Sequence, residues 1–463
     1  MINFFRHIVQ NIQGKVVRHY REAGSWQNLL LHSSLTLTLT GSLSYALGLI
    51  RDKTFAYQFG ASSVLDVYNA AFVVPDFIFA VLVSGALAAA FVPIFTALDE
   101  KSRVKSFIYI NQVLSWLLIL LSIFSLIFAF FLPSLVEYLV PGFDISQRAQ
   151  YILTTRILLI APFFFTLSNT FGNALLSTRD FLWYGLAPVM YNVGIVLGAL
   201  ILVPLLGWSG LVIGTVMGAL LHMLMRAQAV WRYGFRPRIN LTVSAEIKET
   251  AWLMLPKMAQ IGAWQLMLWW FIRLASQSGE GSVTIYNFAY NFQSVPVSLI
   301  GIAIALASFS RLSHLSAHGD FTEFGVIVKR ESFRILWITT LAGLALAAIA
   351  HPLVNFFLGG GKFSDEAVTS TALLLTVYAI SVPLESLMHL LSRAHYALKN
   401  TWWPSLVHIV SIACAMYLSY LLLPNVGLFA LPIAFSSGFA LQCILLSFSL
   451  WRLLKGRHKA WIS

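Results

Sequence analysis

Charged residues and cysteines are scarce in this sequence of 463 residues. Only 10% of the residues are charged and 58% are hydrophobic, with a mean hydropathy of +0.78, whereas about a quarter of the residues of a soluble protein are charged. A water-soluble fold cannot bury so much apolar surface, because even large domains leave exposed about a quarter of the surface of the unfolded chain. The two cysteines, Cys414 and Cys443, both lie in apolar runs, which excludes a disulfide scaffold. The composition therefore predicts a protein embedded in lipid.

Catalytic and metal-binding motifs are also lacking. The sequence has no CxxC, HExxH or GxSxG pattern and no P-loop. His222, His389 and His408 lie in apolar runs, and none is followed four residues later by a residue that could share a metal ion with it. We therefore expect no enzyme activity, no metal and no cofactor.

Long apolar runs, in contrast, are abundant. A membrane-spanning helix needs about 20 mostly apolar residues, and about twelve such runs follow one another along the chain. Because backbone polar groups in lipid must be bonded within their own segment, the runs predict an all-α polytopic membrane protein. We expect the spans at residues 31–58, 66–97, 106–132, 150–176, 182–204, 208–230, 251–276, 283–309, 333–357, 368–392, 402–423 and 427–451.

The basic residues predict the orientation. Lys and Arg outnumber Asp and Glu by 30 to 18. With the N-terminus inside, about 23 of the 30 fall in cytoplasmic segments and about 5 on the opposite side. This asymmetry predicts a multi-pass membrane protein with both termini in the cytoplasm. The basic loops favour anionic membrane lipids, and not nucleic acid, as their partners.

The two halves of the sequence resemble each other, which predicts the domain organisation. The pattern Tyr-Asn-x-Ala occurs at residues 68–71 and again at 286–289, in equivalent spans. Parallel repeats of six helices each, arranged around a central cavity, are a transporter architecture. We expect a basic amphipathic segment on the membrane surface (1–30), an N-lobe (31–230), a cytoplasmic basic linker (231–250), a C-lobe (251–452) and a basic tail (453–463).

Arg51 and Asp52 are the strongest candidates for a binding site. A charge within the hydrocarbon region costs at least about 2.5 kcal/mol, so such a residue usually lines a substrate or ion pathway or forms an ion pair. An arginine fork facing a cavity could hold a phosphate with two hydrogen bonds, while Asp52 limits its charge when the site is empty. The alternative is an interfacial ion pair at the outer end of a helix that stops before Arg51.

Two acidic residues bracket the start of the second span. Asp66 is expected to cap its own helix. Asp76 lies deeper, one residue after Pro75, and is a candidate for substrate contact.

Two further arginines could reach a substrate. Arg156 lies inside the fourth span and could line the cavity or extend to the headgroups. Arg273, on the outer half of the seventh span, follows Trp264, Trp269 and Trp270. An aromatic belt with an arginine at the membrane surface is the alternative account of Arg273.

Glu385, after Pro383, is the only acid well within the second half of the apolar sequence. A carboxylate at this depth could bind a coupling cation or a proton. Alternatively, it could form a hydrogen bond with His389, one turn further along the helix.

Prolines within spans indicate where helices bend, because each proline leaves a backbone carbonyl without its helical partner. Pro75 and Pro296 occupy corresponding spans of the two repeats. We therefore predict that these two prolines mark hinges for alternating access.

A set of motifs, in order from about residue 33 to residue 455, resembles the MurJ/MviN family of lipid II flippases, within the MATE-like superfamily of multidrug and oligosaccharide-lipid exporters. Each motif alone is weak, and together they are specific. They are SLSYALGLIRDKTFAYQFGASSVLDVYNAAFVVPD (42–76), GALAAAFVPIF (85–95), GLVIGTVMGALLHMLM (210–225), GFRPRI (234–239), GSVTIYNFAYNFQSVPVSLIGIAIA (281–305), FLGGGKFSDEAV (357–368) and LLSRAHYALKNTWWP (390–404).

The resemblance implies two six-helix lobes around a V-shaped cavity. This cavity would expose lipid II, a lipid-linked peptidoglycan precursor carrying a pyrophosphate, alternately to the cytoplasm and the periplasm, without covalent chemistry. The resemblance also suggests cell-wall synthesis machinery as a partner. Family members usually carry two further C-terminal helices that extend a groove for the lipid tail, whereas we expect about twelve spans in this sequence.

The sequence departs from the family in its expected cationic site, of which only Arg51 with Asp52 is kept. Asp76 replaces an Asn, and the family's Asp-Arg pair of the eighth span corresponds to Tyr290 and Asn291, of which Asn291 is a candidate substrate contact. Each lost charge-assisted hydrogen bond to the pyrophosphate would remove about 1.5–3 kcal/mol of binding free energy. The alternative function is therefore a cation-coupled exporter of another glycolipid or an amphipathic small molecule, and a third is a membrane scaffold for a synthase complex.

Overall fold

A computed structural model describes residues 26–84, 91–177, 180–232 and 234–460. Most of the amphipathic segment predicted for residues 1–30, and the last three residues of the tail, lie outside these ranges. Within them every regular element is a helix, apart from an isolated bridge between Gly360 and Phe363. The prediction of an all-α fold is confirmed.

The first group of helices extends from residue 26 to residue 232. Many of its members are interrupted, so that two or three short helices follow one another within one predicted span. The helices are α2 (Trp26–Phe59), α3 (Ser63–Ala70), α4 (Val73–Phe79), η1 (Ala80–Ser84), α5 (Val92–Lys101), α6 (Arg103–Leu139), α7 (Ile145–Leu158), α8 (Ala161–Ser177), α9 (Phe181–Leu197), η3 (Gly198–Leu202), α10 (Val203–Leu206) and α11 (Trp208–Arg232).

The second group follows an extended connection and packs mainly against itself. Its long first helix, α12, also contacts α4, η1 and α6 of the first group. The helices are α12 (Ala245–Ser276), α13 (Ser282–Pro296), η4 (Val297–Ile302), α14 (Ala303–His318), α15 (Phe321–Ala348), α16 (Ala350–Leu358), α17 (Asp365–Tyr378), α18 (Ser381–Ala397), α19 (Trp402–Val426), η5 (Gly427–Phe429) and α20 (Ala430–Ala460).

Many of these helices could cross a membrane. Among the described residues, eight helical runs are long and apolar enough, or nine when α17 and α18, which meet at 42°, count as one bent span. The run Trp402–Lys455 contains both α19 and α20, and α2 and α12 are not in this set. Each of the about twelve predicted spans nevertheless coincides with one or more helices. The chain is thus a polytopic membrane protein.

Prolines account for several of the interruptions. Pro75, Pro162, Pro352 and Pro383 each lie one or two residues after the first residue of a new helix, namely α4, α8, α16 and α18. A proline cannot donate to the carbonyl four residues earlier, so the preceding helix ends there. Pro296 is instead the last residue of α13, and the π-helix η4 follows it directly.

Small residues allow close helix packing within the first group. A Cβ atom built on Gly194 would lie 2.3 Å from the Cα of Gly218, and one built on Gly198 would lie 2.4 Å from the Cα of Gly214. Gly194 of α9 and Gly198 at the start of η3 are spaced by four residues, as are Gly214 and Gly218 of α11, which is the small-xxx-small pattern of lipid-embedded helix pairs. Helix α2 packs on the same helix α9, which fixes the position of its charged residues.

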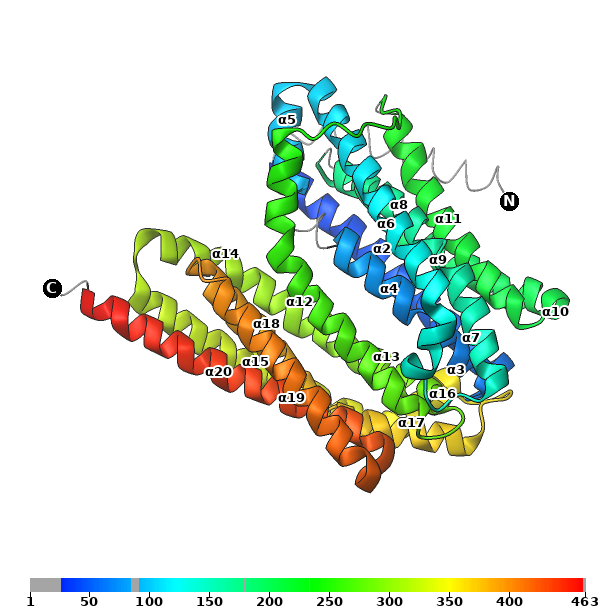
Figure 1. Ribbon diagram of the computed structural model, residues 1–463. Helices are drawn as coiled ribbons and strands as arrows, with labels where there is room; N and C mark the ends of the chain where they lie inside the picture. Colours follow the sequence, from blue (N-terminus) through cyan, green and yellow to red (C-terminus); the bar gives the residue numbers. More distant parts are fainter. Residues whose placement is uncertain (1–25, 85–90, 178–179, 233, 461–463) are drawn as a thin grey trace.

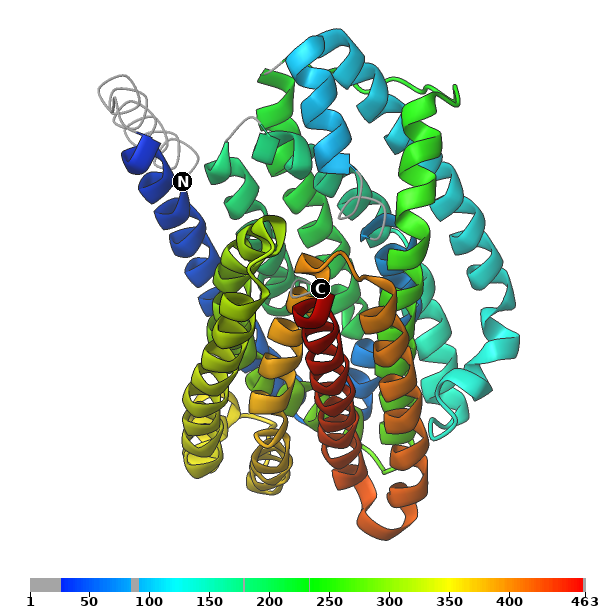
Figure 2. The ribbon, with the colours of Figure 1, turned by 90° about the vertical axis from the view of Figure 1, so that its left-hand side faces the viewer.

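The two groups of helices meet near α3, α13 and α16 and separate toward α5 and α14 (Figure 1). Turning the molecule by 90° shows α5 and α14 well apart at the same end (Figure 2). The domain boundaries at residues 231–250, and the repeat relationship between the two groups, stay predictions.

Candidate functional site

A cavity of about 300 Å³ lies between the two groups of helices. Its walls come from α2, α3, α4 and α9 on one side and from α12 and α13 on the other. Four of the residues that the sequence singled out line it together, namely Arg51, Asp52, Asp76 and Asn291. The cavity is therefore the candidate functional site.

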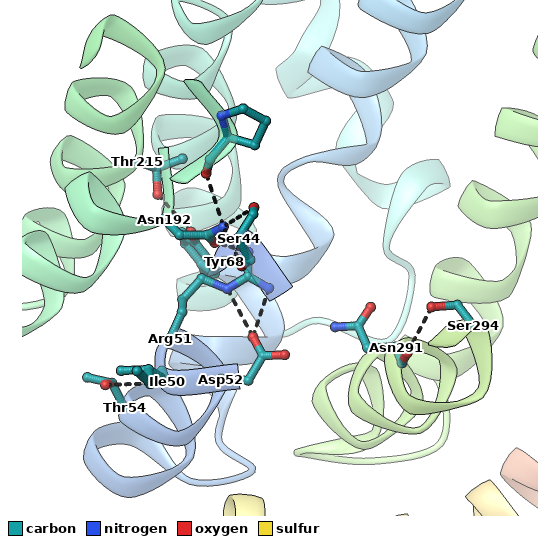
Figure 3. Close-up of polar contacts among 11 residues, drawn as sticks. Ser44, Ile50, Arg51, Asp52, Thr54, Tyr68, Asn192, Thr215, Asn291 and Ser294 are labelled. Atoms are coloured by element: carbon teal, nitrogen blue, oxygen red, sulfur yellow. Dashed lines mark hydrogen bonds and ion pairs between the residues drawn. The ribbon is translucent and has the colours of Figure 1, made fainter. Parts of the chain in front are cut away.

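Arg51 is held in place by hydrogen bonds that it donates to a residue of its own helix and to one of α9 (Figure 3). Its Nε and Nη2 donate to the same oxygen of Asp52, Oδ1, at 2.9 and 2.8 Å, and its Nη1 donates to Oδ1 of Asn192 at 3.3 Å. Asn192 in turn donates to the carbonyl of Pro188 at 3.2 Å. Helix α2 continues to Phe59, so the pair does not lie at the end of a helix.

Asp76 is the unpaired charge of the cavity. Its side chain is exposed to the space between the helix groups, and no residue of the described chain forms a hydrogen bond or an ion pair with it. The described lining thus contains two carboxylates, Asp52 and Asp76, and one guanidinium, that of Arg51. With all three ionised, the cavity is slightly negative.

Amide and indole groups make up most of the remaining polar lining. They are supplied by Asn69, Gln265, Trp269, Asn287 and Asn291. The indole Nε1 of Trp269 and the amide Nδ2 of Asn287 are buried without a hydrogen-bond partner. A buried donor without a partner costs about 1–3 kcal/mol, so these two donors are suited to an oxygen-rich ligand.

The sequence held a signal for two of these amides. Asn69 and Asn287 are the asparagines of the repeated Tyr-Asn-x-Ala pattern, and they line the cavity from opposite sides. Gln265 and Trp269 gave no such signal, because nothing in an apolar run shows which face of α12 is turned to the cavity.

Arg156 and Arg273 lie outside the cavity. Arg156 is exposed on the outer surface, where its Nε and Nη2 donate to the carbonyl of Ala129 at 3.1 and 3.0 Å. Arg273 donates to the carbonyl of Tyr138, and its guanidinium carbon lies 4.6 Å from the centre of the Tyr138 ring and 5.8 Å from that of Trp270. Arg273 thereby links α12 to the end of α6.

Glu385 is buried inside the second group of helices, on α18. Its Oε2 accepts a hydrogen bond of 2.9 Å from Nε2 of Gln293, and no bond joins it to His389 within the described chain. Glu385 is not part of the cavity lining.

One end of the cavity is closed by contacts between the two groups, which we call the closed end. Its central residue is Asp66, which caps α13 of the opposite group and not its own helix as the sequence suggested. The carboxylate of Asp66 accepts from the backbone N–H groups of Gly281 (2.6 Å) and Thr284 (2.8 Å) and from the Thr284 hydroxyl (2.6 Å). Gly281 has a φ of +81°, which a glycine adopts without strain.

Further backbone contacts complete the closed end. Ser63 N–H donates to Oε1 of Glu280 at 2.9 Å, and Lys362 N–H donates to the carbonyl of Tyr57 at 2.9 Å. The ammonium group of Lys53 donates to the carbonyl of Gly359. These bonds join α2 and α3 to α13 and to the loop after α16.

Comparisons with known proteins agree with this architecture. The family model "Lipid II flippase MurJ" matches residues 55–462. A probable lipid II flippase MurJ from Bdellovibrio bacteriovorus is 28% identical over 413 residues, covering 87% of this chain and 78% of that protein.

Two solved structures share the fold. A lipid II flippase MurJ in an inward closed conformation superimposes with a TM-score of 0.78 at 21% identity, covering 90% of this chain and 87% of the other. An inward-facing multidrug resistance MATE family transporter of the MOP superfamily superimposes with a TM-score of 0.75 at 14% identity, covering 90% and 96%.

Proposed function

This chain belongs to the MurJ family of lipid II flippases, and from that premise we propose that it moves lipid II from the inner to the outer leaflet of the bacterial cytoplasmic membrane. Transport by this route needs binding and release but no covalent step. The observation that carries the proposal is the polar cavity between the two helix groups, which is closed at one end and contains Arg51.

The orientation of the cavity follows from the charges around it. The closed end contains Lys53 and Lys362, and Arg273 lies in the last turn of α12. All three are among the about 5 basic residues that the sequence predicts on the side opposite the cytoplasm. Most other basic residues lie toward the opposite end, which we assign to the cytoplasm with both termini. In this orientation the structure is the inward-facing state of the transport cycle.

Arg51 is our proposed contact for the pyrophosphate. Asp52 holds two of its nitrogens through a single carboxylate oxygen, so an arriving phosphate can exchange with Asp52 while the guanidinium stays in place. Charge-assisted bonds of this kind contribute about 1.5–3 kcal/mol each. The amides of Asn287 and Asn291 and the indole of Trp269 would meet the oxygen atoms of the headgroup.

The helix breaks supply the movable parts. We propose that Pro75, between α3 and η1, and Pro296, between α13 and η4, are the hinges about which the two groups rotate. Opening of the outer side requires that Asp66 release the first turn of α13.

Lipids of the surrounding bilayer are proposed partners as well. Arg311, Arg330 and Arg334 are exposed around a groove between α14 and α15, at the end that we assign to the cytoplasm. Anionic headgroups concentrate at such sites. An association with cell-wall synthesis machinery stays a prediction.

One observation favours a second candidate function. The described lining of the cavity contains two carboxylates and one guanidinium, so a substrate less negative than a pyrophosphate would meet less repulsion. Export of another glycolipid or of an amphipathic small molecule, coupled to a cation, is therefore the alternative.

Complementation tests the primary proposal. Expression of this chain in a bacterium depleted of its own lipid II flippase is expected to restore growth, and Arg51→Ala is expected to abolish the rescue at an unchanged membrane level. Arg156→Ala serves as the matched control, since it removes an arginine that lies on the outer surface, and should rescue fully. Full rescue by Arg51→Ala would contradict the role of Arg51, and no rescue by the unmodified chain would favour the second candidate.

A further inference from the structure

Glu385 lies in the second helix group, outside the cavity, and has no counter-ion. Its side chain is 9% exposed, and no Lys, Arg or His of the described chain forms an ion pair or hydrogen bond with it. Among the described residues, the one hydrogen bond that it accepts comes from the neutral amide of Gln293. An ionised carboxylate with a single neutral donor is costly in a low-dielectric interior, and the group takes up a proton when no cation is present.

Gln293 is arranged so that it can serve both protonation states of Glu385. The Gln293 side chain is fully buried, and its Nε2 donates at 2.9 Å both to Oε2 of Glu385 and to Oγ of Ser381. Its Oε1 is buried with no hydrogen-bond partner. A carboxylate accepts from the amide N–H, whereas a protonated Glu385 has an O–H that needs an acceptor. Rotation of the amide by half a turn would present Oε1 to that O–H.

The titratable groups around Glu385 are phenols, a thiol and a histidine. Tyr290 on α13 and Tyr378 on α17 are neighbours, His389 is one turn away on α18, and the thiol of Cys443 on α20 donates to the carbonyl of Leu384 at 3.2 Å. η4 contains no titratable residue.

No ion pair of the described chain joins Glu385 to the charged residues of α14 and α15, of which Lys329 is exposed. Arg311 on α14 pairs with Glu323, and Glu331 on α15 pairs with Arg330 and Arg334. The proton is thus the simplest species that neutralises Glu385.

We propose that Glu385, with Gln293 and Ser381, forms a proton-binding site that is separate from the cavity and controls the break in α13. Uptake forms an O–H bond on the Glu385 carboxylate and cancels its charge. Release restores the carboxylate and the hydrogen bond that Gln293 donates to it.

The site is connected to both the cavity and the proposed hinge. Gln293 lies three residues before Pro296, after which the π-helix η4 begins. Gly301 of η4 packs so closely on α18 that a Cβ atom there would lie 2.3 Å from Oγ of Ser386, the residue after Glu385. Tyr290, which lines the cavity, also packs on Tyr378 with ring centres 6.2 Å apart. π-Helical turns within α-helices are frequent at functional sites.

Infrared spectroscopy of the full-length protein in lipid nanodiscs, at neutral pH in potassium buffer, tests the proton site directly. The unmodified protein is expected to show a carboxylic-acid C=O band that is lost in Glu385→Gln. Gln293→Leu is expected to keep the band and shift its frequency, because it removes the hydrogen-bond partner of the acid. Glu331→Gln is the matched control, since Glu331 is a buried acid held by two arginines, and should leave the band unchanged.

Two results would overturn the proposal. A band that Glu385→Gln leaves intact would mean that Glu385 is ionised, and a band that disappears when sodium replaces potassium would mean that the site holds Na⁺. Only the link from this site to transport rests on the proposed function. Lipid II movement is therefore measured on the same proteins, and its absence from the unmodified protein, with the band present, would count against the flippase function alone.

Discussion

Three side chains from two helices set the electrostatics of the cavity. Arg51 and Asp52 are consecutive residues of α2, and the pair is joined to α9 through Asn192. Asp76 comes from α4 and has no partner in the described chain. Binding of a phosphate therefore depends on whether Asp52 releases Arg51 and on how strongly the negative charge of Asp76 repels the phosphate.

Removal of the unpaired charge should strengthen the binding of lipid II. Asp76→Asn keeps the size of the side chain and takes away one negative charge that shares the cavity with the phosphate. At an effective dielectric constant of about 20, one such charge contributes about 1–2 kcal/mol, so binding is expected to tighten about fivefold to thirtyfold. Titration of the purified protein with labelled lipid II measures this change. Glu137→Gln, at an exposed acid on α6, should have no effect, and weaker binding by Asp76→Asn would contradict the account.

The sequence predicts the site residues whose side chains are unusual within a membrane-spanning segment. Arg51, Asp52 and Asp76 stand out because a charge is rare in an apolar run. Arg156 and Arg273 stand out for the same reason, but they lie outside the cavity. The free-energy cost of placing a charge in lipid does not indicate which face of a helix the residue occupies. Gln265 and Trp269 are polar residues of an ordinary kind, and only the packing of α12 brings them to the cavity.

At the scale of elements, the chain is a set of long helices with defined breaks. The existence of the helices and the breaks near Pro75, Pro162 and Pro383 follow from the sequence, because apolar length and proline have direct consequences for the backbone. The π-helical turns η1, η3 and η4 could not be predicted in this way. They depend on how neighbouring helices pack, as at Gly301 against Ser386.

The contact between Asp66 and the N-terminus of α13 can be tested by substitution. Asp66→Asn should weaken the closed end by about 1–2 kcal/mol, the usual contribution of a helix cap with charge-assisted bonds. Hydrogen exchange at the amides of Gly281 and Thr284 is expected to become about tenfold faster.

A matched control is available on α7. Asp144 caps its own helix by accepting a 2.8 Å hydrogen bond from the Gln147 N–H. Asp144→Asn should therefore affect exchange near Gln147 only. Unchanged exchange at Gly281 and Thr284 in Asp66→Asn would show that this cap does not hold the two groups together.

At the scale of the whole molecule, two helix groups enclose a polar cavity and touch at one end. The membrane character follows from composition, and the family follows from motifs spread over most of the chain. The closed end could not be predicted, because its contacts use backbone groups that carry no sequence signature, namely the carbonyl of Tyr57 in the last turn of α2 and the N–H groups of Gly281 and Lys362. This architecture is the basis of our proposal that the two groups rock around a central site.

Movement of lipid II across a bilayer by the purified chain tests the central claim most directly. Proteoliposomes containing labelled lipid II in one leaflet, with the unmodified chain, Arg51→Ala or Arg156→Ala, would report the rate at which the label reaches the other leaflet. The account predicts rapid movement with the unmodified chain and with Arg156→Ala, and a rate near that of protein-free liposomes with Arg51→Ala. Movement at the protein-free rate with the unmodified chain, or at the full rate with Arg51→Ala, would contradict it.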